Sequence, residues 1–373
     1  MCAKVKKEDN KEEKVDQIES LLQAKEFQGL HLGSRSGNEI EKPEIISTSS
    51  FFFDQILGGG FRAGSWIRAK SEPEMGKTSQ GLCWGRNWQN HFKERAVVVV
   101  FNAEGRVTRD LLVRSGLDIS KERFRIIDTN NADFIYNMME RLIVDNKDDL
   151  VYYFIVDSTD AAQRSQDMLK SLGEAEKIGG SATIASAAGK RLSLLFNRKQ
   201  HVLYMTSQVR DKVNTYSPQG NAGKEASGGN APRFYSSLTM EIKKHWSDWS
   251  IREEPSDAKS KEIGRLVNIK LEKTYNESSG SIVQVPVKYG HIGGIWHEYE
   301  AMLICQAWNL YINSGKGRFN IDPKFAQELS EQKISFEESF HGEKNMRAAF
   351  EINPQLVEYV YDKMRKIAIS YPY

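Results

Sequence analysis

Five short runs of apolar residues, separated by amphipathic stretches, place the strongest constraint on the fold of this chain of 373 residues. The runs cover residues 66–70, 96–103, 123–128, 150–157 and 201–208. Near-continuous apolar strands that alternate with helices are typical of a parallel sheet buried on both faces. Three later segments alternate with a period of two, at 239–246, 264–275 and 281–290. The pattern therefore predicts an α/β fold with a mainly parallel central sheet and an antiparallel extension.

The two ends of the chain differ in pattern from this central region. Ile18, Leu21 and Leu22 share one face of a predicted amphipathic helix, and a polar stretch follows. The tail is mainly helical, with helices predicted over 298–313 and 343–369. We therefore expect three parts: an N-terminal helix and arm over 1–44, a core over 45–295, and a small α+β C-terminal domain over 296–373.

Composition excludes several classes of protein. Lys and Arg number 52 against 50 Asp and Glu, so the chain does not bind nucleic acid through bulk charge and needs local cations for that purpose. Cys2, Cys83 and Cys305 are scattered, which indicates a reducing compartment. No apolar stretch approaches the ~18 residues of a membrane span, and the charged N-terminus is not a secretory signal. We expect a soluble cytoplasmic protein.

The strand predicted at 66–70 is followed by the sequence SEPEMGKTS and then by a helical pattern. A strand–loop–helix unit of this kind directs backbone N–H groups and a helix N-terminus at phosphate oxygens. Lys77 supplies a charge for the outer phosphates, and Thr78 supplies a hydroxyl for Mg²⁺. The pattern departs from consensus at Ser71, where glycine is expected, and a backbone angle that only glycine adopts easily would weaken the grip on phosphate. The predicted nucleotide-binding residues are Ser71, Glu72, Pro73, Glu74, Met75, Gly76, Lys77, Thr78 and Ser79.

Two acids end the neighbouring apolar strands. Asp157 closes the run at 150–157, where an acid beside a phosphate loop holds Mg²⁺, although an Asp at a strand-to-helix turn also serves as a helix cap. Glu104 follows the run at 96–103, and a carboxylate at this edge of the sheet is suited to polarise an attacking water as general base. Three such features on three core strands predict a nucleotide triphosphatase.

Two polar, glycine-rich segments follow strands of the same sheet, at 171–182 and 207–231. A structureless segment as long as the second one, inside a compact domain, is typical of a functional or a disordered region. Its cations Arg210, Lys212 and Lys224 are suited to a sugar–phosphate backbone when many copies line up. Since both segments follow strands, we expect them to emerge at one edge of the sheet.

The order of these motifs resembles the RecA family of recombinases over nearly the whole chain, from about Gln17 to Ile367. EPEMGKTS resembles the family's phosphate loop, FNAEG its glutamate strand, and FIVDS its second metal motif. SQVR followed by GGNAPRFYSS is the most specific match and marks the second DNA-binding loop. NMRAAFEINPQLVEYVYDKMRKI resembles the end of the C-terminal domain. The resemblance implies a RecA-like ATPase core and an N-terminal arm used for oligomerisation.

The resemblance also implies roles for individual residues. ATP and Mg²⁺ would be held by the phosphate loop, with Asp157 as metal partner and Glu104 as general base. Gln208 would sense the terminal phosphate, and Lys273 would reach ATP across a subunit interface. Tyr289 would lie against adenine, and Phe234 would pack on the neighbouring subunit. DNA contacts would come from Lys177, Gly179, Gly180, Arg210, Lys212, Lys224, Gly228, Gly229 and Asn230.

The chain departs from the family pattern in ways that suggest a remote, phage-encoded member. Tyr275 stands where the family commonly has a second lysine, and one cation fewer would slow hydrolysis. The stretch 105–111 lacks the family's adenine-side acid and aromatic residue.

The leading hypothesis is an ATP-dependent recombinase that forms a helical filament on single-stranded DNA and pairs it with homologous duplex. Single-strand-binding and loader proteins would be further partners, and no membrane is involved. Two alternatives stay open: a hexameric DNA helicase with a RecA core, and a non-catalytic DNA-binding filament or mediator protein. Filaments and DNA-stimulated ATP turnover would distinguish them.

Other aromatic and sulfur residues have simpler interpretations. Trp84 and Trp88 are four residues apart on one predicted helix, which favours packing over a role in base stacking. Cys83 lies in the same helix and is interpreted as a small core residue.

Overall fold

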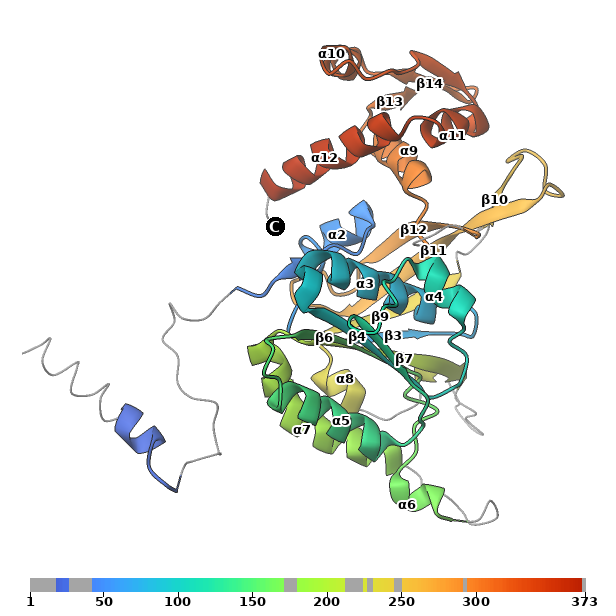
Figure 1. Cartoon of the computed structure of the whole chain (residues 1–373). Helices are drawn as coiled ribbons and strands as arrows, with labels where there is room; N and C mark the ends of the chain where they lie inside the picture. The colour runs from blue at the N-terminus through green and yellow to red at the C-terminus, as the bar shows by residue number, and fades with distance from the viewer. Residues whose placement is uncertain are drawn as a thin grey trace, which may run out of the picture. The chain divides into compact units, whose positions relative to one another are not determined.

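The computed structural model describes residues 18–26, 42–170, 180–211, 224–226, 231–244, 250–290 and 294–370. Its central feature is a mixed sheet of ten described strands (Figure 1). In spatial order its main path is β10 (Ser250–Arg252), β11 (Glu262–Lys273), β9 (Leu238–Lys244), β3 (Trp66–Ser71), β7 (Val202–Asp211), β6 (Val151–Asp157), β4 (Ala96–Asn102) and β5 (Phe124–Ile127). Off this path, β12 (Ile282–Lys288) pairs with β11, and β8 (Lys224–Ala226) pairs with β7.

The middle of the sheet is parallel, as the apolar runs predict. Strands β9, β3, β7, β6, β4 and β5 pair in parallel, and β11 pairs antiparallel with β9, β10 and β12. One detail of the prediction is wrong: β9, expected in the antiparallel extension, joins β3 in parallel, and the extension begins at β11. The register pairs Ser71 with Gln208 and Asn102 with Asp157, so the strands carrying the predicted site end at one edge.

Helices cover both faces of the sheet (Figure 1). One face carries α2 (Phe51–Leu57), α3 (Lys77–Phe92) and α4 (Arg109–Ser115), and the other carries α5 (Ala132–Val144), α7 (Gly180–Lys199) and α8 (Ala231–Tyr235). Helix α6 (Ser165–Met168) is a short turn before α7. Local sequence accounts for α5: the Asn131 side chain caps it by accepting from Phe134 N, and Ile135, Met139 and Ile143 are buried at helical spacing.

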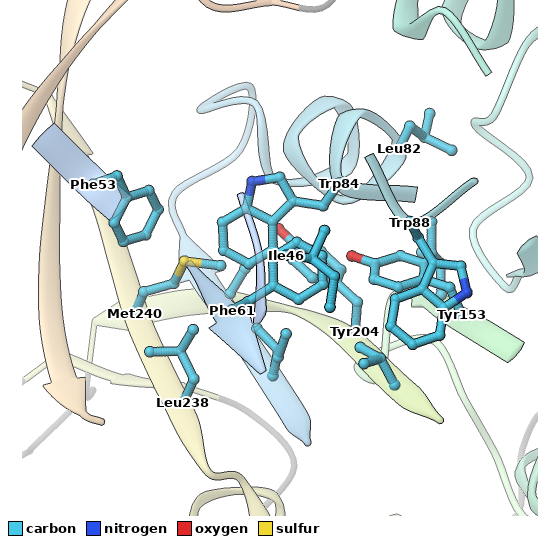
Figure 2. Packing of buried hydrophobic residues seen from close by; sticks show 14 of the residues in the cluster. Ile46, Phe53, Phe61, Leu82, Trp84, Trp88, Tyr153, Tyr204, Leu238 and Met240 are labelled. Carbon is cyan, nitrogen blue, oxygen red and sulfur yellow. The ribbon is translucent and has the colours of Figure 1, made fainter. Parts of the chain in front are cut away.

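The core beneath α3 is rich in aromatic side chains, and Figure 2 shows their packing. Trp84 stacks on Phe61 with ring centroids 4.8 Å apart and meets Tyr204 edge-on at 5.8 Å. Trp88 is fully buried and its Nε1 donates to Val151 O at 3.1 Å. Burial of each such ring contributes about 1.5–3 kcal/mol. The prediction that Trp84 and Trp88 serve packing is confirmed, and Cys83 is likewise buried.

The C-terminal segment is built around an apolar cluster that contains Trp296, Tyr311 and Phe350 and also includes Phe51 of α2 and Ile251 of β10. Its elements are α9 (His297–Ala307), β13 (Tyr311–Asn313), β14 (Arg318–Ile321), α10 (Pro323–Glu331), β15 (Ser339–His341), α11 (Glu343–Glu351) and α12 (Pro354–Ser370). The strands form a three-stranded antiparallel sheet. The predicted helix over 298–313 is therefore too long, because the chain turns at Asn309 with a φ of 55°. The helix predicted over 343–369 is two helices, since Pro354 starts a new one.

Two short strands, β1 (Ile45–Ile46) and β2 (Phe61–Arg62), pair antiparallel beside α2. Contacts divide the chain into two units, 1–43 and 44–373. In the first unit, residues 18–22 are helical, in agreement with the predicted amphipathic helix. Among all the described residues, no helix is long and apolar enough to cross a membrane.

Candidate active site

The loop between β3 and α3 has the geometry that the SEPEMGKTS motif predicts. Strand β3 ends at Ser71 and α3 begins at Lys77, with Gly76 as its N-cap at a φ of 88°. Left-handed φ values occur at Glu74 (62°) and at Gly76, and not at Ser71. Ser71 therefore does not adopt the glycine-only backbone angle that would weaken the grip on phosphate, and serine fits this position without strain.

The Lys77 side chain is turned into its own loop. Its Nζ donates to Ser71 O at 3.1 Å, to Ser71 Oγ at 2.7 Å and to Glu72 O at 3.0 Å. Burial lowers the pKa of Lys77 below its ordinary value, and the carboxylates of Asp157 and Glu104 oppose this shift. The Lys77 ammonium is thus held by uncharged acceptors, which a negatively charged group can replace.

The beginning of α3 is fixed on the sheet by a close approach to β7. A Cβ on Gly81 would meet the Tyr204 ring at 2.6 Å, so only glycine allows this packing. The Tyr204 hydroxyl then donates to Lys77 O at 2.9 Å. Helix α3 and the loop that precedes it are therefore positioned against the strand that leads to Gln208.

Asp157 lies at the carboxyl end of β6, and hydroxyl groups donate to both of its oxygens. Thr78 Oγ1 donates to Oδ2 at 2.8 Å, and Thr206 Oγ1 donates to Oδ1 at 2.6 Å. Thr78 and Asp157 come from elements 79 residues apart in sequence and meet as predicted. This set of oxygen atoms fits a Mg²⁺ ion that arrives with phosphate oxygens.

Glu104 stands directly after β4, where backbone bonds tie it to β6. Ala103 N and Glu104 N both donate to Asp157 O, at 2.8 and 3.1 Å. Its Oε1 accepts from Gln208 Nε2 at 3.1 Å and from the Ser158 hydroxyl, and its Oε2 lies 3.3 Å from Arg106 Nη1. The structure thus brings the predicted general base and the predicted phosphate sensor, Gln208, into direct contact.

Gln208 belongs to β7, which continues beyond it to Asp211. Its backbone N donates to Asp160 Oδ2 at 2.6 Å. The sequence suggested a segment without secondary structure at 207–231, but β7 pairs there with β8, with Asp211 opposite Lys224 and Arg210 opposite Glu225. Backbone pairing of this kind depends on partners 13 to 17 residues further along the chain, which local composition does not reveal.

Several predicted DNA contacts lie outside the described residues: Lys177, Gly179, Lys212, Gly228, Gly229 and Asn230. Arg210 lies on β7, Lys224 on β8, and Gly180 is the first residue of α7. Their roles stay predictions.

The other predicted site residues lie apart from the Lys77–Glu104 group. Lys273 Nζ donates to Phe234 O at 2.8 Å, and the Phe234 side chain is 74% exposed. Tyr289 donates to Glu262 at 2.6 Å and faces Arg265, which in turn donates to Glu74 O in the loop between β3 and α3 at 3.2 Å. Tyr275, the position of the absent lysine, lies under Arg62 with its hydroxyl 3.3 Å from Ser65 Oγ.

Sequence reasoning missed four polar residues of this edge: Arg106, Ser158, Asp160 and Thr206. Ser158 and Asp160 follow Asp157 directly, so their place at a strand end was a usable signal. Thr206 contacts Asp157 only because β6 and β7 pair in parallel, and Arg106 contacts Glu104 through a turn. Neither contact has a sequence signature.

A parallel sheet with a strand–loop–helix unit and acids at one carboxyl edge defines an α/β protein of the nucleotide-binding class. A family model described as the RecA N-terminal domain matches residues 12–291. The chain is 28% identical to Protein RecA of Ureaplasma parvum serovar 3 over 239 residues, which cover 64% of this chain and 67% of the relative. It is 26% identical to Protein RecA of Mycoplasma genitalium over 304 residues (79% and 83%) and 24% identical to that of Thermotoga maritima over 280 (74% and 70%).

The chain therefore belongs to the RecA family, and the resemblance seen in the motifs is confirmed. Membership of the RecA family favours a RecA-type recombinase over the two alternatives, a hexameric helicase and a non-catalytic mediator protein. The family match spans the sheet and both ends of the candidate site, from the phosphate loop to Tyr289.

Proposed function

We propose that this chain is a DNA-dependent ATPase that polymerises on single-stranded DNA and exchanges DNA strands in recombination and repair. The observation that carries the proposal is the meeting of Lys77, the Thr78–Asp157 pair and the Glu104–Gln208 pair at one edge of the sheet. From this edge β7 runs directly into the segment with the predicted DNA contacts.

ATP would be held by backbone groups of the phosphate loop, by Lys77 and, at the base, by Tyr289. Lys77 is buried and its present acceptors are two carbonyls and one hydroxyl, so a triphosphate offers it a stronger, charged partner. Thr78 and Asp157 would hold Mg²⁺, which would bridge phosphate oxygens and offset their charge.

Hydrolysis would use Glu104 to accept a proton from the attacking water. The carboxylate is only 14% exposed and is oriented by Ser158 and Gln208. A buried, oriented carboxylate next to the phosphate loop suits general base catalysis, which contributes about 10²–10⁴ in rate. Lys77 would stabilise the charge that develops on the transferred phosphoryl group.

Gln208 would transmit a change in the bound nucleotide to the segment that contacts DNA. Its side chain contacts Glu104 and its backbone N contacts Asp160, so a shift of Glu104 toward substrate changes the bonding at the end of β7. Such a shared element is the physical basis for coupling between two sites. The segment after β7, together with the segment before α7, would contact DNA.

Filament formation would use surfaces away from this edge. Phe234 is exposed beside Lys273, a combination suited to contact with a neighbouring subunit and its nucleotide. A head-to-tail interface whose repetition does not close into a ring generates an open helical filament of subunits. The N-terminal part over 1–44 and the C-terminal domain over 296–373 would complete the subunit.

The test is strand exchange and DNA-stimulated ATP turnover by the full chain and by Lys77→Ala, with Lys121→Ala, an exposed lysine, as control. We expect Lys77→Ala to lose both activities and Lys121→Ala to keep them. ATP turnover without strand exchange, together with closed rings in electron micrographs, would support a helicase instead. DNA binding without any ATP turnover would support a mediator protein.

A further inference from the structure

Arg106 lies beside the carboxylate that is proposed as general base. The residue follows β4 in the turn after Glu104, and its Nη1 is 3.3 Å from Glu104 Oε2. The Arg106 side chain is 72% exposed, whereas Glu104 is only 14% exposed. An exposed arginine contributes little to stability through such a pair, so the fold alone does not explain this contact.

Glu104 does not need Arg106 as a partner. Its Oε1 already accepts from the Ser158 hydroxyl and from Gln208 Nε2, which hold the carboxylate in place. The Arg106 guanidinium lies 3.3 Å from the other oxygen, Oε2, and so occupies the atom that would accept a proton from water. The ion pair thus opposes the role proposed for Glu104 as long as it persists.

The charge of Arg106 also acts on Lys77. The guanidinium lies within electrostatic reach of the Lys77 ammonium, as do the carboxylates of Asp157 and Glu104. Two cations that repel each other therefore face the same region at the edge of the sheet. A polyanion that enters over Lys77 would relieve this repulsion and would offer Arg106 a partner of higher charge than one carboxylate.

We propose that Arg106 is a phosphate-binding residue that exchanges Glu104 for the terminal phosphate of ATP bound in the same subunit. The inference rests on the proposed function, because it takes the Lys77 loop as the nucleotide site. Before ATP arrives, Arg106 restrains Glu104. When the terminal phosphate is present, Arg106 moves to it by a change of side-chain conformation, and Oε2 of Glu104 becomes available to water. A diphosphate lacks the group that draws Arg106 away.

The experiment compares wild type with Arg106→Ala and Arg106→Lys, and uses Arg109→Ala as control because Arg109 is exposed three residues further along the chain. Equilibrium binding of ADP and of a nonhydrolysable ATP analogue is measured with Mg²⁺, followed by ATP turnover with single-stranded DNA. We expect Arg106→Ala to weaken binding of the analogue by about 10-fold or more while ADP binding changes by less than about twofold. Turnover falls as well, Arg106→Lys is intermediate, and Arg109→Ala behaves as wild type.

Three results would overturn the inference: equal losses for ADP and the analogue, no loss for either, or faster turnover in Arg106→Ala. The last result would mean that the arginine only restrains Glu104. Lys77→Ala separates this failure from failure of the proposed function. If wild type binds and hydrolyses ATP through Lys77 but Arg106→Ala is unchanged, only the role of Arg106 is wrong. If wild type binds no ATP, both are wrong.

Discussion

Two carboxylates of this chain, Glu104 and Glu300, have several polar partners each but differ in what those partners allow. Glu300 on α9 is fully buried and accepts from the Ser50 and Tyr361 hydroxyls and from the backbone N atoms of Phe51 and Phe52. These donors belong to the start of α2 and to α12, so Glu300 joins three helices. No ligand can enter without breaking this set.

Only one of the two carboxylate oxygens of Glu104 is held by partly buried protein groups. Its Oε1 is oriented by protein groups, but its Oε2 contacts the exposed Arg106, whose position can change. The number of hydrogen bonds to a carboxylate therefore does not identify a functional acid. Partners that solvent or substrate can replace mark a reactive group, whereas partners enclosed in packed helices mark a structural one.

The largest effect on ATP turnover is expected at Asp157, the residue proposed to hold Mg²⁺ together with Thr78. Asp157→Asn removes the charge that faces Thr78, so we expect ATP turnover to fall about 100-fold or more and to require higher Mg²⁺ concentrations. Steady-state turnover measured against Mg²⁺ concentration checks this. Asp110→Asn, on exposed α4, is the control, and equal behaviour of the two variants would contradict the assignment.

A substitution at Glu300 is expected to lower the stability of the protein instead of its ATP turnover. Glu300→Ala leaves two hydroxyls and two backbone N–H groups without their acceptor, so we expect the free energy of unfolding to fall by about 4–5 kcal/mol. Urea denaturation measures this, with the exposed Glu358→Ala as control. A loss below about 1 kcal/mol would show that these donors find other partners and that the cluster is not structural.

A pH effect is expected near the same cluster, at Asp54 on α2. Burial raises the pKa of Asp54 from 3.8 to about 7, against the opposing hydrogen bonds from Ser47 and Thr48. Because the pKa of Asp54 is higher in the folded protein than in the unfolded chain, the protonated carboxyl contributes its full stability below the unfolded pKa. This contribution is lost as the pH rises toward 7. The stability of wild type relative to Asp54→Asn should therefore fall between pH 4 and 7, by up to about 4 kcal/mol. Thermal or urea unfolding across this range checks it, and a rising difference would contradict it.

The smallest effect is expected at Ser71. Its hydroxyl accepts from Lys77 Nζ at 2.7 Å, and Ser71→Ala removes this competitor for the ammonium. We expect the ATP analogue to bind about threefold more tightly, because one neutral hydrogen bond no longer has to be exchanged. Binding titration measures the change. Weaker binding would instead show that the hydroxyl contacts phosphate, and Ser256→Ala, in an exposed turn, should change nothing.

Much of the reactive edge was predictable from sequence, because it depends on local patterns. Apolar runs that are buried on both faces encode β3, β4, β6 and β7, and the residues directly after them meet at the edge of any parallel sheet. Lys77, Glu104 and Asp157 follow from these patterns, whereas the role of Gln208 comes from the resemblance to the RecA family.

The remaining features depend on contacts between distant residues. The backbone of Ser71, the pairing of β7 with β8 and the Glu300 cluster follow from tertiary packing, which no local pattern encodes. The small sheet after α9 agrees with the predicted α+β C-terminal part, but its strands are only three or four residues long, so no local pattern locates them. The division of the chain at residue 296 stays a prediction, since contacts keep 44–373 as one unit.

Glu104 is, in the proposed function, the reactive carboxylate of an ATP-driven, DNA-binding edge of the sheet. Glu104→Gln keeps the size of the side chain and one acceptor oxygen but cannot accept a proton. We predict that this variant retains ATP-dependent binding to single-stranded DNA while its ATP turnover falls at least about 100-fold. Turnover within about twofold of wild type, measured on the same DNA, would contradict the account.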